Sequence, residues 1–192
     1  MTTLPNIAIT GQIRSGKDTV GRILFAKYGY TRFAFGDAIR RYARDIFPSE
    51  FENGRKPREL LQWFGQTMRE RDPDVWVRKC FESIEFERAV TAAYGGLGGI
   101  EKFHAVITDL RQPNEYERCR TEGFVIIRVS APESLRIHRA INANDTFDLR
   151  DFSHETESYV DTFAVDYEIE NTGNWADLER KIDEIMMRYL PQ

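Results

Sequence analysis

Residues 11–19 read Gly-Gln-Ile-Arg-Ser-Gly-Lys-Asp-Thr and follow directly on the apolar run Ile-Ala-Ile-Thr of residues 7–10. A buried strand, a glycine-spaced loop and then a helical pattern are typical of a P-loop, in which backbone N–H groups at a helix N-terminus bind phosphate oxygens. Lys17 adds a mobile positive charge. The stretch therefore predicts a triphosphate site, with the nucleotide contacted by Gly11, Arg14, Ser15, Gly16, Lys17, Asp18 and Thr19.

One position departs from the usual P-loop pattern. Asp18 stands where a Ser or Thr normally gives its hydroxyl to Mg²⁺. Either Thr19 supplies an oxygen, or Asp18 reaches the metal directly or through water, because Mg²⁺ accepts carboxylates and keeps several waters. Alternatively, Asp18 only complements the positive end of the helix dipole. Both residues are candidate metal ligands.

The chain has 192 residues, of which 41% are hydrophobic, which is enough for one buried domain with at most a small lid. Its net charge of −4 provides no global positive field for a nucleic-acid polymer. Cys80 and Cys119 lie far apart and match no zinc spacing. With no apolar stretch near the ~20 residues that span a bilayer, we expect a cytoplasmic protein with reduced thiols. A homodimer is compatible with this composition.

Five short apolar segments rich in β-branched and aromatic residues recur, and each is followed by a helical pattern or a turn. This alternation predicts an α/β protein with the P-loop NTPase fold, a five-stranded parallel sheet with helices on both faces. Ligands should bind at the carboxyl ends of the strands. The predicted strands are residues 7–10, 31–35, 105–108, 124–129 and 165–169.

The long segment between the second and third strands has amphipathic helical spacing and is the natural place for substrate specificity. We predict one domain over residues 1–192, with a helical substrate-binding insertion at 37–100 and a lid at 136–153. The glycine-rich residues 94–99 resemble a phosphate loop, but no strand precedes them. We expect a flexible connection there, without chemistry.

Asp109 ends the apolar run of residues 105–108 and should lie at the same sheet edge as the P-loop. Mg²⁺ that bridges terminal phosphates needs such an acid, directly or through water. The alternative is an acid that caps a turn. Arg111 follows two residues later and could face the phosphates, or could form a salt bridge to Asp109 or Glu115.

Basic residues gather after the second strand, where Arg40 and Arg44 share a helix face and Arg41 points about 100° away. The planar fork of arginine suits a phosphate. Arg69 and Arg71 form a second cluster, for which a solvated charged face is the alternative.

Asp37 could act on an attacking oxygen or a sugar hydroxyl, or could be a helix N-cap. The candidate substrate-binding residues are therefore Asp37, Arg40, Arg41, Arg69 and Arg111.

Arg136 and Arg139 belong to a predicted helix after the fourth strand, and a polar stretch with Arg150 follows. Arginines on a closing lid would stabilise transferring charge and exclude water, although a surface helix would look similar. The three histidines show no metal spacing and are expected to be structural or solvent-facing. They are His104, His138 and His154.

These motifs together resemble P-loop kinases of the deoxynucleoside monophosphate kinase type of phages and bacteria, and more distantly dephospho-coenzyme A kinases. The similarity rests on residues 15–19, 33–37, 60–65, 72–76 and 107–115. It implies that Lys17 contacts the β- and γ-phosphates, that Asp109 and Arg111 lie at the substrate and metal centre, and that Arg136 and Arg139 belong to the lid helix. Residues 169–173 resemble the loop that supports the ATP base, which makes Asn171 a candidate for contacting that base.

The resulting hypothesis is phosphoryl transfer from ATP, with Mg²⁺, to a small-molecule acceptor, a nucleoside or deoxynucleoside monophosphate, with Lys17, Asp109, Arg111, Arg136 and Arg139 in the reaction centre. If the acceptor is instead a hydroxyl, as in dephospho-coenzyme A, Asp37 becomes a candidate base. The competing class is a nucleotide-binding regulator or ATPase, which would lack a second anion site.

Overall fold

The computed structural model describes residues 4–52, 57–98, 103–142 and 159–190. At its centre is a parallel five-stranded sheet with strand order β2-β3-β1-β4-β5. This confirms the predicted α/β class and places the strand that carries the P-loop in the middle. The strands are β1 (Ile7–Thr10), β2 (Thr31–Phe33), β3 (Ala105–Leu110), β4 (Val125–Ser130) and β5 (Tyr167–Glu170).

Two strand ends differ from the prediction in ways that matter for the site. β2 ends at Phe33 because Phe35 already begins a helix. β3 continues through Leu110, and its register against β1 shifts by one residue, from Ala8 opposite Ile107 to Thr10 opposite Leu110. Such a bulge re-aims a side chain. Asp109 therefore lies within β3, next to this irregularity, rather than after the strand.

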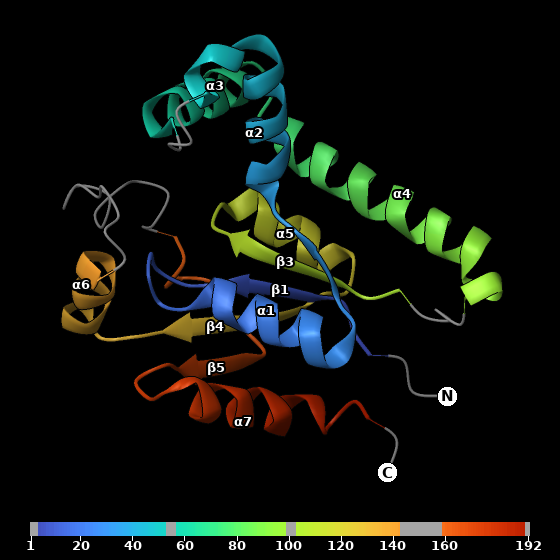
Figure 1. Cartoon of the computed structure of the whole chain (residues 1–192), viewed down its shortest axis with the longest axis vertical. Helices are drawn as coiled ribbons and strands as arrows, with labels where there is room; N and C mark the ends of the chain where they lie inside the picture. The colour runs from blue at the N-terminus through green and yellow to red at the C-terminus, as the bar shows by residue number, and fades with distance from the viewer. Residues whose placement is uncertain (1–3, 53–56, 99–102, 143–158, 191–192) are drawn as a thin grey trace.

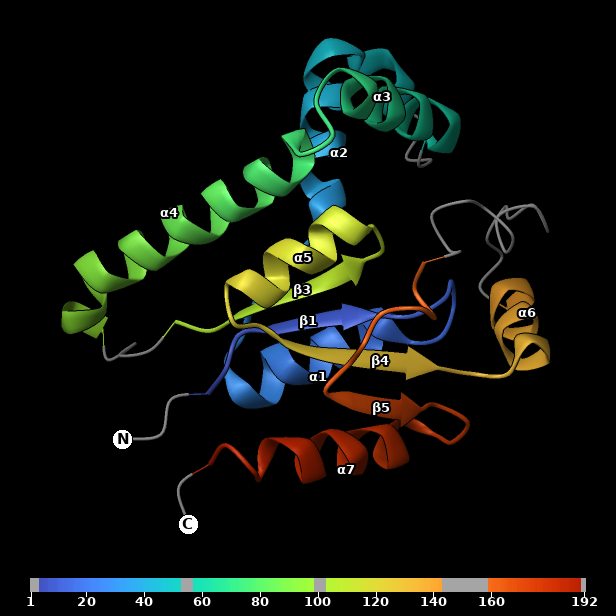
Figure 2. The same cartoon turned by 180° about the vertical axis from the view of Figure 1, so that it is seen from behind.

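Helices cover both faces of the sheet (Figures 1 and 2). On one face lie α1 (Lys17–Tyr28) and α7 (Trp175–Met186), and on the other α4 (Val75–Gly98) and α5 (Pro113–Thr121). All four residues of β1 are buried, as expected for a central parallel strand. Its side chains enter two separate core clusters, with Ile7 and Ile9 in one and Ala8 in the other.

The first part of the segment predicted as an insertion at 37–100 forms a helical lobe, which we define as α2 (Phe35–Ile46), the short 3₁₀ helix Pro48–Phe51 and α3 (Arg58–Arg71). The second part is α4, which packs on the sheet. This lobe lies at the opposite end of the molecule from α7 (Figure 1). Ile39 and Phe64 pack with Trp76 of α4 in a third core cluster. The Trp76 indole N–H donates to the Gly65 carbonyl at 2.9 Å, which ties α4 to the lobe.

The prediction of a flexible connection at residues 94–99 is wrong for the described part of that segment, because α4 continues through Gly98. Extending an existing helix adds hydrogen bonds without a new nucleation cost, so the glycines, each costing about 1 kcal/mol relative to alanine, do not end it before Gly98. Gly99 lies outside the described residues.

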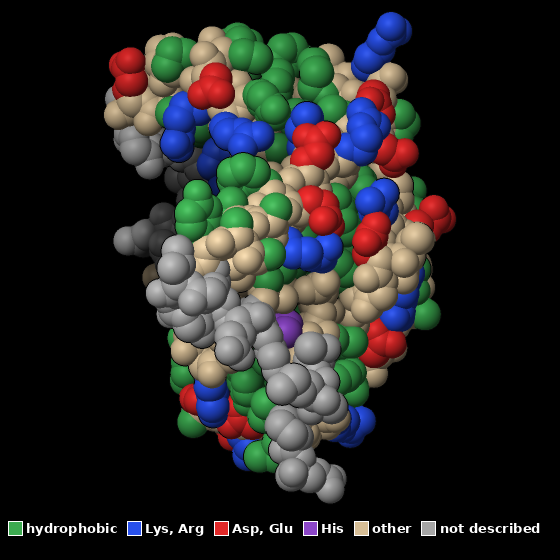
Figure 3. Space-filling model, turned by 90° about the vertical axis from the view of Figure 1, so that its right-hand side faces the viewer, with side chains coloured by type: hydrophobic (Ala, Val, Ile, Leu, Met, Phe, Trp, Pro, Cys, Tyr) green, Lys and Arg blue, Asp and Glu red, His purple; other side chains and the backbone are tan. Residues whose placement is uncertain are grey.

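The helix predicted after the fourth strand is α6 (Glu133–Asn142), and it lies beyond the carboxyl end of β4 (Figure 1). The rest of the predicted lid, with Arg150, and His154 lie outside the described residues. No described helix is both long and apolar enough to cross a bilayer. Acidic and basic side chains are interspersed on the face shown in Figure 3, rather than gathered by sign.

Candidate phosphate and acceptor site

The loop between β1 and α1 has the backbone geometry of a phosphate cradle. Gly11 and Gly16 have φ values of 137° and 109°, which disfavour any other residue. A Cβ on Gly11 would lie 2.1 Å from the Val129 carbonyl oxygen, and one on Gly16 would lie 2.2 Å from Asn171 Nδ2. Both glycines are therefore required by the close approach of neighbouring strands and loops.

The start of α1 is suited to an anion. Gly16 is the N-cap residue, and within the described part of the chain no side chain caps this first turn. The Ser15 hydroxyl is fully buried and has no hydrogen-bond partner among the described residues. Backbone N–H groups at a helix N-terminus together with a buried donor fit phosphate oxygens. The loop therefore fits the triphosphate that its sequence predicts.

Lys17 is buried at 7% exposure, and its ammonium donates to the carbonyl oxygens of Gly11 at 2.6 Å and Gln12 at 2.8 Å. The charge thus lies against the loop itself. Burying a lysine is costly unless its charge is compensated. An anion held by the same loop would supply such compensation.

Two arginines of α6 donate to backbone carbonyls of this loop. Arg136, also buried, donates to the Ile13 carbonyl at 3.4 Å. Arg139 donates to the carbonyls of Arg14 at 3.4 Å and Ser15 at 3.3 Å. Burial lowers the pKa of Arg139 from its ordinary value. The structure therefore brings Lys17, Arg136 and Arg139 together around one loop.

Asn171 braces the cradle from the β5 side. Its side-chain amide donates to the Ser15 carbonyl at 2.8 Å, and its own carbonyl accepts from Arg139 at 2.9 Å. The residue is buried. Its amide N–H thus contacts the loop backbone, so its predicted contact with the ATP base stays a prediction.

The predicted metal ligands occupy different surroundings. Asp18 is exposed in the first turn of α1, and the Thr19 hydroxyl accepts from Arg22 at 3.5 Å. No group of three or more His, Cys, Asp or Glu residues in the described chain could hold a metal. Mg²⁺ characteristically binds through one or two carboxylates plus substrate phosphates, so the residues present suit a shared site rather than a protein cage.

Asp109 is held by the N-terminus of α2. Its two carboxylate oxygens accept from the backbone N–H groups of Phe35 at 2.8 Å and Gly36 at 2.9 Å. Burial raises the pKa of Asp109, while these two N–H groups and the charge of Arg111 act in the opposite direction. The carboxylate thus links β3 to the helical lobe, a contact that its sequence position did not reveal.

Asp37 is the third residue of α2, so the alternative that it is the N-cap is wrong. The carboxylate that serves this helix start comes from Asp109, across the sheet edge. Asp37 instead forms ion pairs with Arg32 at 2.9 Å and Arg40 at 3.2 Å. Two predicted acceptor ligands, Asp37 and Arg40, are therefore brought together.

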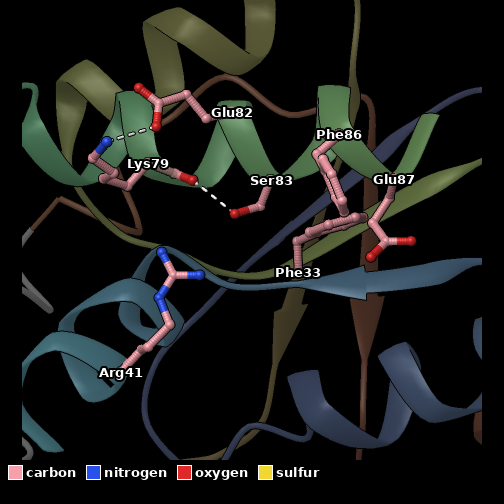
Figure 4. Close-up of a pocket in the computed structure, with 7 residues that line it drawn as sticks. All are labelled: Phe33, Arg41, Lys79, Glu82, Ser83, Phe86 and Glu87. Carbon is pink, nitrogen blue, oxygen red and sulfur yellow. Dashed lines mark hydrogen bonds and ion pairs between the residues drawn. The ribbon is translucent and has the colours of Figure 1, made fainter. Parts of the chain in front are cut away.

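Arg41 faces elsewhere. It lines a pocket of about 380 Å³ between β2, α2 and α4, opposite an ion pair between Lys79 and Glu82 (Figure 4). The pocket is also lined by Phe33, Ser83, Phe86 and Glu87. All seven lining residues come from β2, α2 and α4, so Arg41 is separated from the P-loop group, in line with the predicted divergence from Arg40.

Arg69 of α3 approaches the first turn of α5. Its Nη2 lies 3.9 Å from Glu115 Oε1 in the ion pair of these side chains. Arg71 is exposed and Arg44 lies over the Phe51 ring, so the described contacts single out Arg69 from its basic neighbours.

Glu115 and Asn114 are functional candidates that the sequence interpretation passed over. Glu115 is 3% exposed, and its Oε2 accepts from the backbone N–H groups of Arg111 at 2.9 Å and Gln112 at 3.0 Å. Burial, and then the charge of Asp109, raises the pKa of Glu115 to about 7. The spacing of Gln112 and Glu115 is that of a capping box, which could have signalled this arrangement.

Both cysteines and His104 are buried in the fold, whereas His138 is exposed to solvent. Cys80 and Cys119 are buried free thiols whose pKa values are raised by burial, which makes them unreactive. His104 is buried beside Tyr30, and His138 is exposed.

No protein-family model matches the chain, and no curated protein sequence is similar enough to count as a relative. Solved structures are similar over almost the whole chain. Shikimate kinase from Acinetobacter baumannii, in complex with shikimate, has a TM-score of 0.55 at 19% identity, covering 100% of this chain and 97% of that one. Dephospho-CoA kinase from Campylobacter jejuni has a TM-score of 0.51 at 16% identity, covering 96% and 97%.

A sugar kinase from Janibacter sp. has a TM-score of 0.55 at 12% identity, covering 96% of this chain and 93% of that one. At these identities the similarity concerns the fold. The chain has the fold of P-loop kinases, with the parallel sheet and two-sided helix layers that its sequence predicted.

Proposed function

We propose that the protein is an ATP-dependent phosphotransferase whose acceptor is a nucleoside or deoxynucleoside monophosphate. The observation that carries this proposal is the buried phosphate loop with Lys17, Arg136 and Arg139 around it. Three cations converging on one backbone cradle suit the tail of a triphosphate rather than a single weak anion.

The chain's residues would divide the work between two groups. Lys17 and the N–H groups at the start of α1 would bind the terminal phosphates, and Arg136 and Arg139 would neutralise charge on them. ATP would supply the phosphoryl group, with Mg²⁺ neutralising its terminal phosphates through Asp18, Thr19 or Asp109.

The acceptor would lie at the end of β3 beneath the helical lobe, where Arg111 and Arg69 would bind it. Asp37 and Arg40 of α2 would be further acceptor contacts. An acceptor that is already an anionic phosphate needs no catalytic base, so alignment and charge neutralisation suffice. This reason favours a monophosphate, because the lobe offers arginines for an anion.

A hydroxyl acceptor is the second candidate. Two similar structures are named shikimate kinase and dephospho-CoA kinase, which supports small-molecule kinases in general. In that case Asp37 would be the candidate base, but its ion pairs to Arg32 and Arg40 favour a charged, positioning role.

Labelled ATP incubated with a panel of acceptors separates these proposals. Transfer to a nucleoside or deoxynucleoside monophosphate is the expected result, and transfer only to shikimate, a sugar or dephospho-coenzyme A would replace it with the second candidate. If no acceptor is labelled and no monophosphate binds in calorimetry, the protein is a nucleotide-binding regulator or ATPase and the proposal is wrong.

A further inference from the structure

The segment from Asp109 to Glu115 contacts both α-helices of the helical lobe and the turn that follows α3. Asp109 accepts from the N-terminus of α2, and Glu115 pairs with Arg69 of α3. Asn114 donates to the Pro73 carbonyl at 2.9 Å and to Asp74 Oδ1 at 2.8 Å, in the turn between α3 and α4. α5 and the end of β3 lie directly below α2 (Figure 2).

Within this segment, Glu115 contacts both arginines of the proposed acceptor site. One carboxylate oxygen accepts from the backbone N–H of Arg111, and the other faces the guanidinium of Arg69. The glutamate is 3% exposed, and a second backbone N–H, from Gln112, fixes its orientation. A buried carboxylate with three donors or cations around it has little freedom to move.

We propose that Glu115 is the positioning residue of the acceptor site, which holds the guanidinium of Arg69 from the lobe near the backbone of Arg111 at the sheet edge. This inference rests on the proposed function and deepens it, because it states how the acceptor arginines are aligned. Glu115 touches no reacting atom in this account. It acts by joining an arginine carried by the lobe to the backbone of the residue that follows β3.

Glu115→Gln tests the proposal in assays at pH 8, above the pKa of about 7 that burial gives this carboxyl. An amide oxygen can still accept from the two N–H groups, while the charge facing Arg69 is lost. We expect the acceptor KM to rise about tenfold, with the KM of ATP within about twofold of the wild type. Glu117→Gln, an exposed acid on the same helix, is the control and should change neither value. An unchanged acceptor KM, or an equal rise in both KM values, would overturn the proposal.

A double-mutant cycle gives a readout that a merely structural residue would not move. Arg69→Ala should raise the acceptor KM about tenfold in the wild type but only about twofold in the Glu115→Gln background, because the pair is already broken. Additive effects would show that the two residues act independently, which contradicts the proposal.

Hydrogen exchange separates this inference from the proposed function, because it needs no turnover. In Glu115→Gln, amides of α3 and of the turn before α4 should exchange faster, while those of α1 remain at the wild-type rate. If no acceptor is phosphorylated but the amides of α3 exchange faster while those of α1 do not, the proposed function fails and the coupling of Glu115 to the lobe stands. Unchanged exchange in α3 rejects the coupling, whatever the activity.

Discussion

The phosphate loop and the segment from Asp109 to Glu115 lie at the same sheet edge, yet they are built differently. The phosphate loop is shaped by backbone, since Gly11 and Gly16 adopt conformations closed to other residues. Side chains make the contacts of the segment from Asp109 to Glu115, and their partners belong to the helical lobe, such as Phe35, 74 residues before Asp109. The first region is a backbone cradle, braced by the side chain of Asn171, that fits phosphates, whereas the second ties the lobe to the sheet.

This difference predicts where substitutions act. Changes in the phosphate loop should affect nucleotide binding and turnover without moving the lobe. Substitutions in the segment from Asp109 to Glu115 should weaken acceptor binding, loosen the packing of the lobe and lower the stability of the fold. The predictions below test that separation.

Lys17→Ala should have the largest effect. Removing the only lysine of the phosphate loop should lower phosphoryl transfer by about 10³-fold or more, because in the proposed reaction its charge would act on the transferring group. Initial rates with labelled ATP measure this. Lys27→Ala, at the exposed end of the same helix, is the matched control and should retain turnover. Wild-type turnover in Lys17→Ala would remove the phosphate loop from the mechanism.

Arg111→Ala should lower turnover by about 10- to 100-fold while ATP affinity changes by no more than about twofold. The reason is that Arg111 belongs to the proposed acceptor site rather than to the phosphate loop. Steady-state rates and calorimetry with an ATP analogue measure the two quantities. Arg118→Ala, at an exposed ion pair with Glu122, is the control. An unchanged rate would return Arg111 to a salt-bridge role.

The same contrast explains which parts of the fold and of the candidate site could be predicted from the sequence. The phosphate loop, the central strand and the position of Asp109 at the sheet edge could be predicted, because each is encoded in a short continuous pattern. The bulge in β3 and the hydrogen bonds of Asp109 to the start of α2 could not be predicted, because they depend on the packing of distant segments. The capping-box spacing of Gln112 and Glu115 indicated a helix start but not the approach of Arg69.

Stability should depend on pH through Glu115, whose neighbours include Arg69 of α3, Asp109 of β3 and Cys119 of its own helix. Its pKa is raised to about 7 from 4.5, so the folded state binds this proton more tightly than the unfolded state. The free energy of unfolding should therefore fall as pH rises from 4.5 to 7, by on the order of 3 kcal/mol.

Urea unfolding of the wild type and Glu115→Gln across this range isolates the contribution of Glu115. The variant should lose less stability with rising pH than the wild type. Parallel curves for the two proteins would mean that Glu115 titrates normally in the folded state.

Asp109→Asn should have the smallest of these effects, a loss of about 1–2 kcal/mol in the free energy of unfolding. An amide offers one acceptor oxygen where the carboxylate satisfies two N–H groups of α2. Chemical denaturation measures the loss, and Asp45→Asn, an exposed acid on α2, should leave stability unchanged. A wild-type midpoint for Asp109→Asn would show that α2 does not depend on this contact.

The most direct test of the central claim is calorimetric binding of an ATP analogue and of a nucleoside monophosphate to the wild type, Lys17→Ala and Arg111→Ala. If the two sites are separable, Lys17→Ala should lose binding of the analogue and keep binding of the monophosphate. Arg111→Ala should keep binding of the analogue and lose binding of the monophosphate. If the wild type binds no monophosphate, or if each substitution weakens both ligands equally, the two regions do not form a donor and an acceptor site.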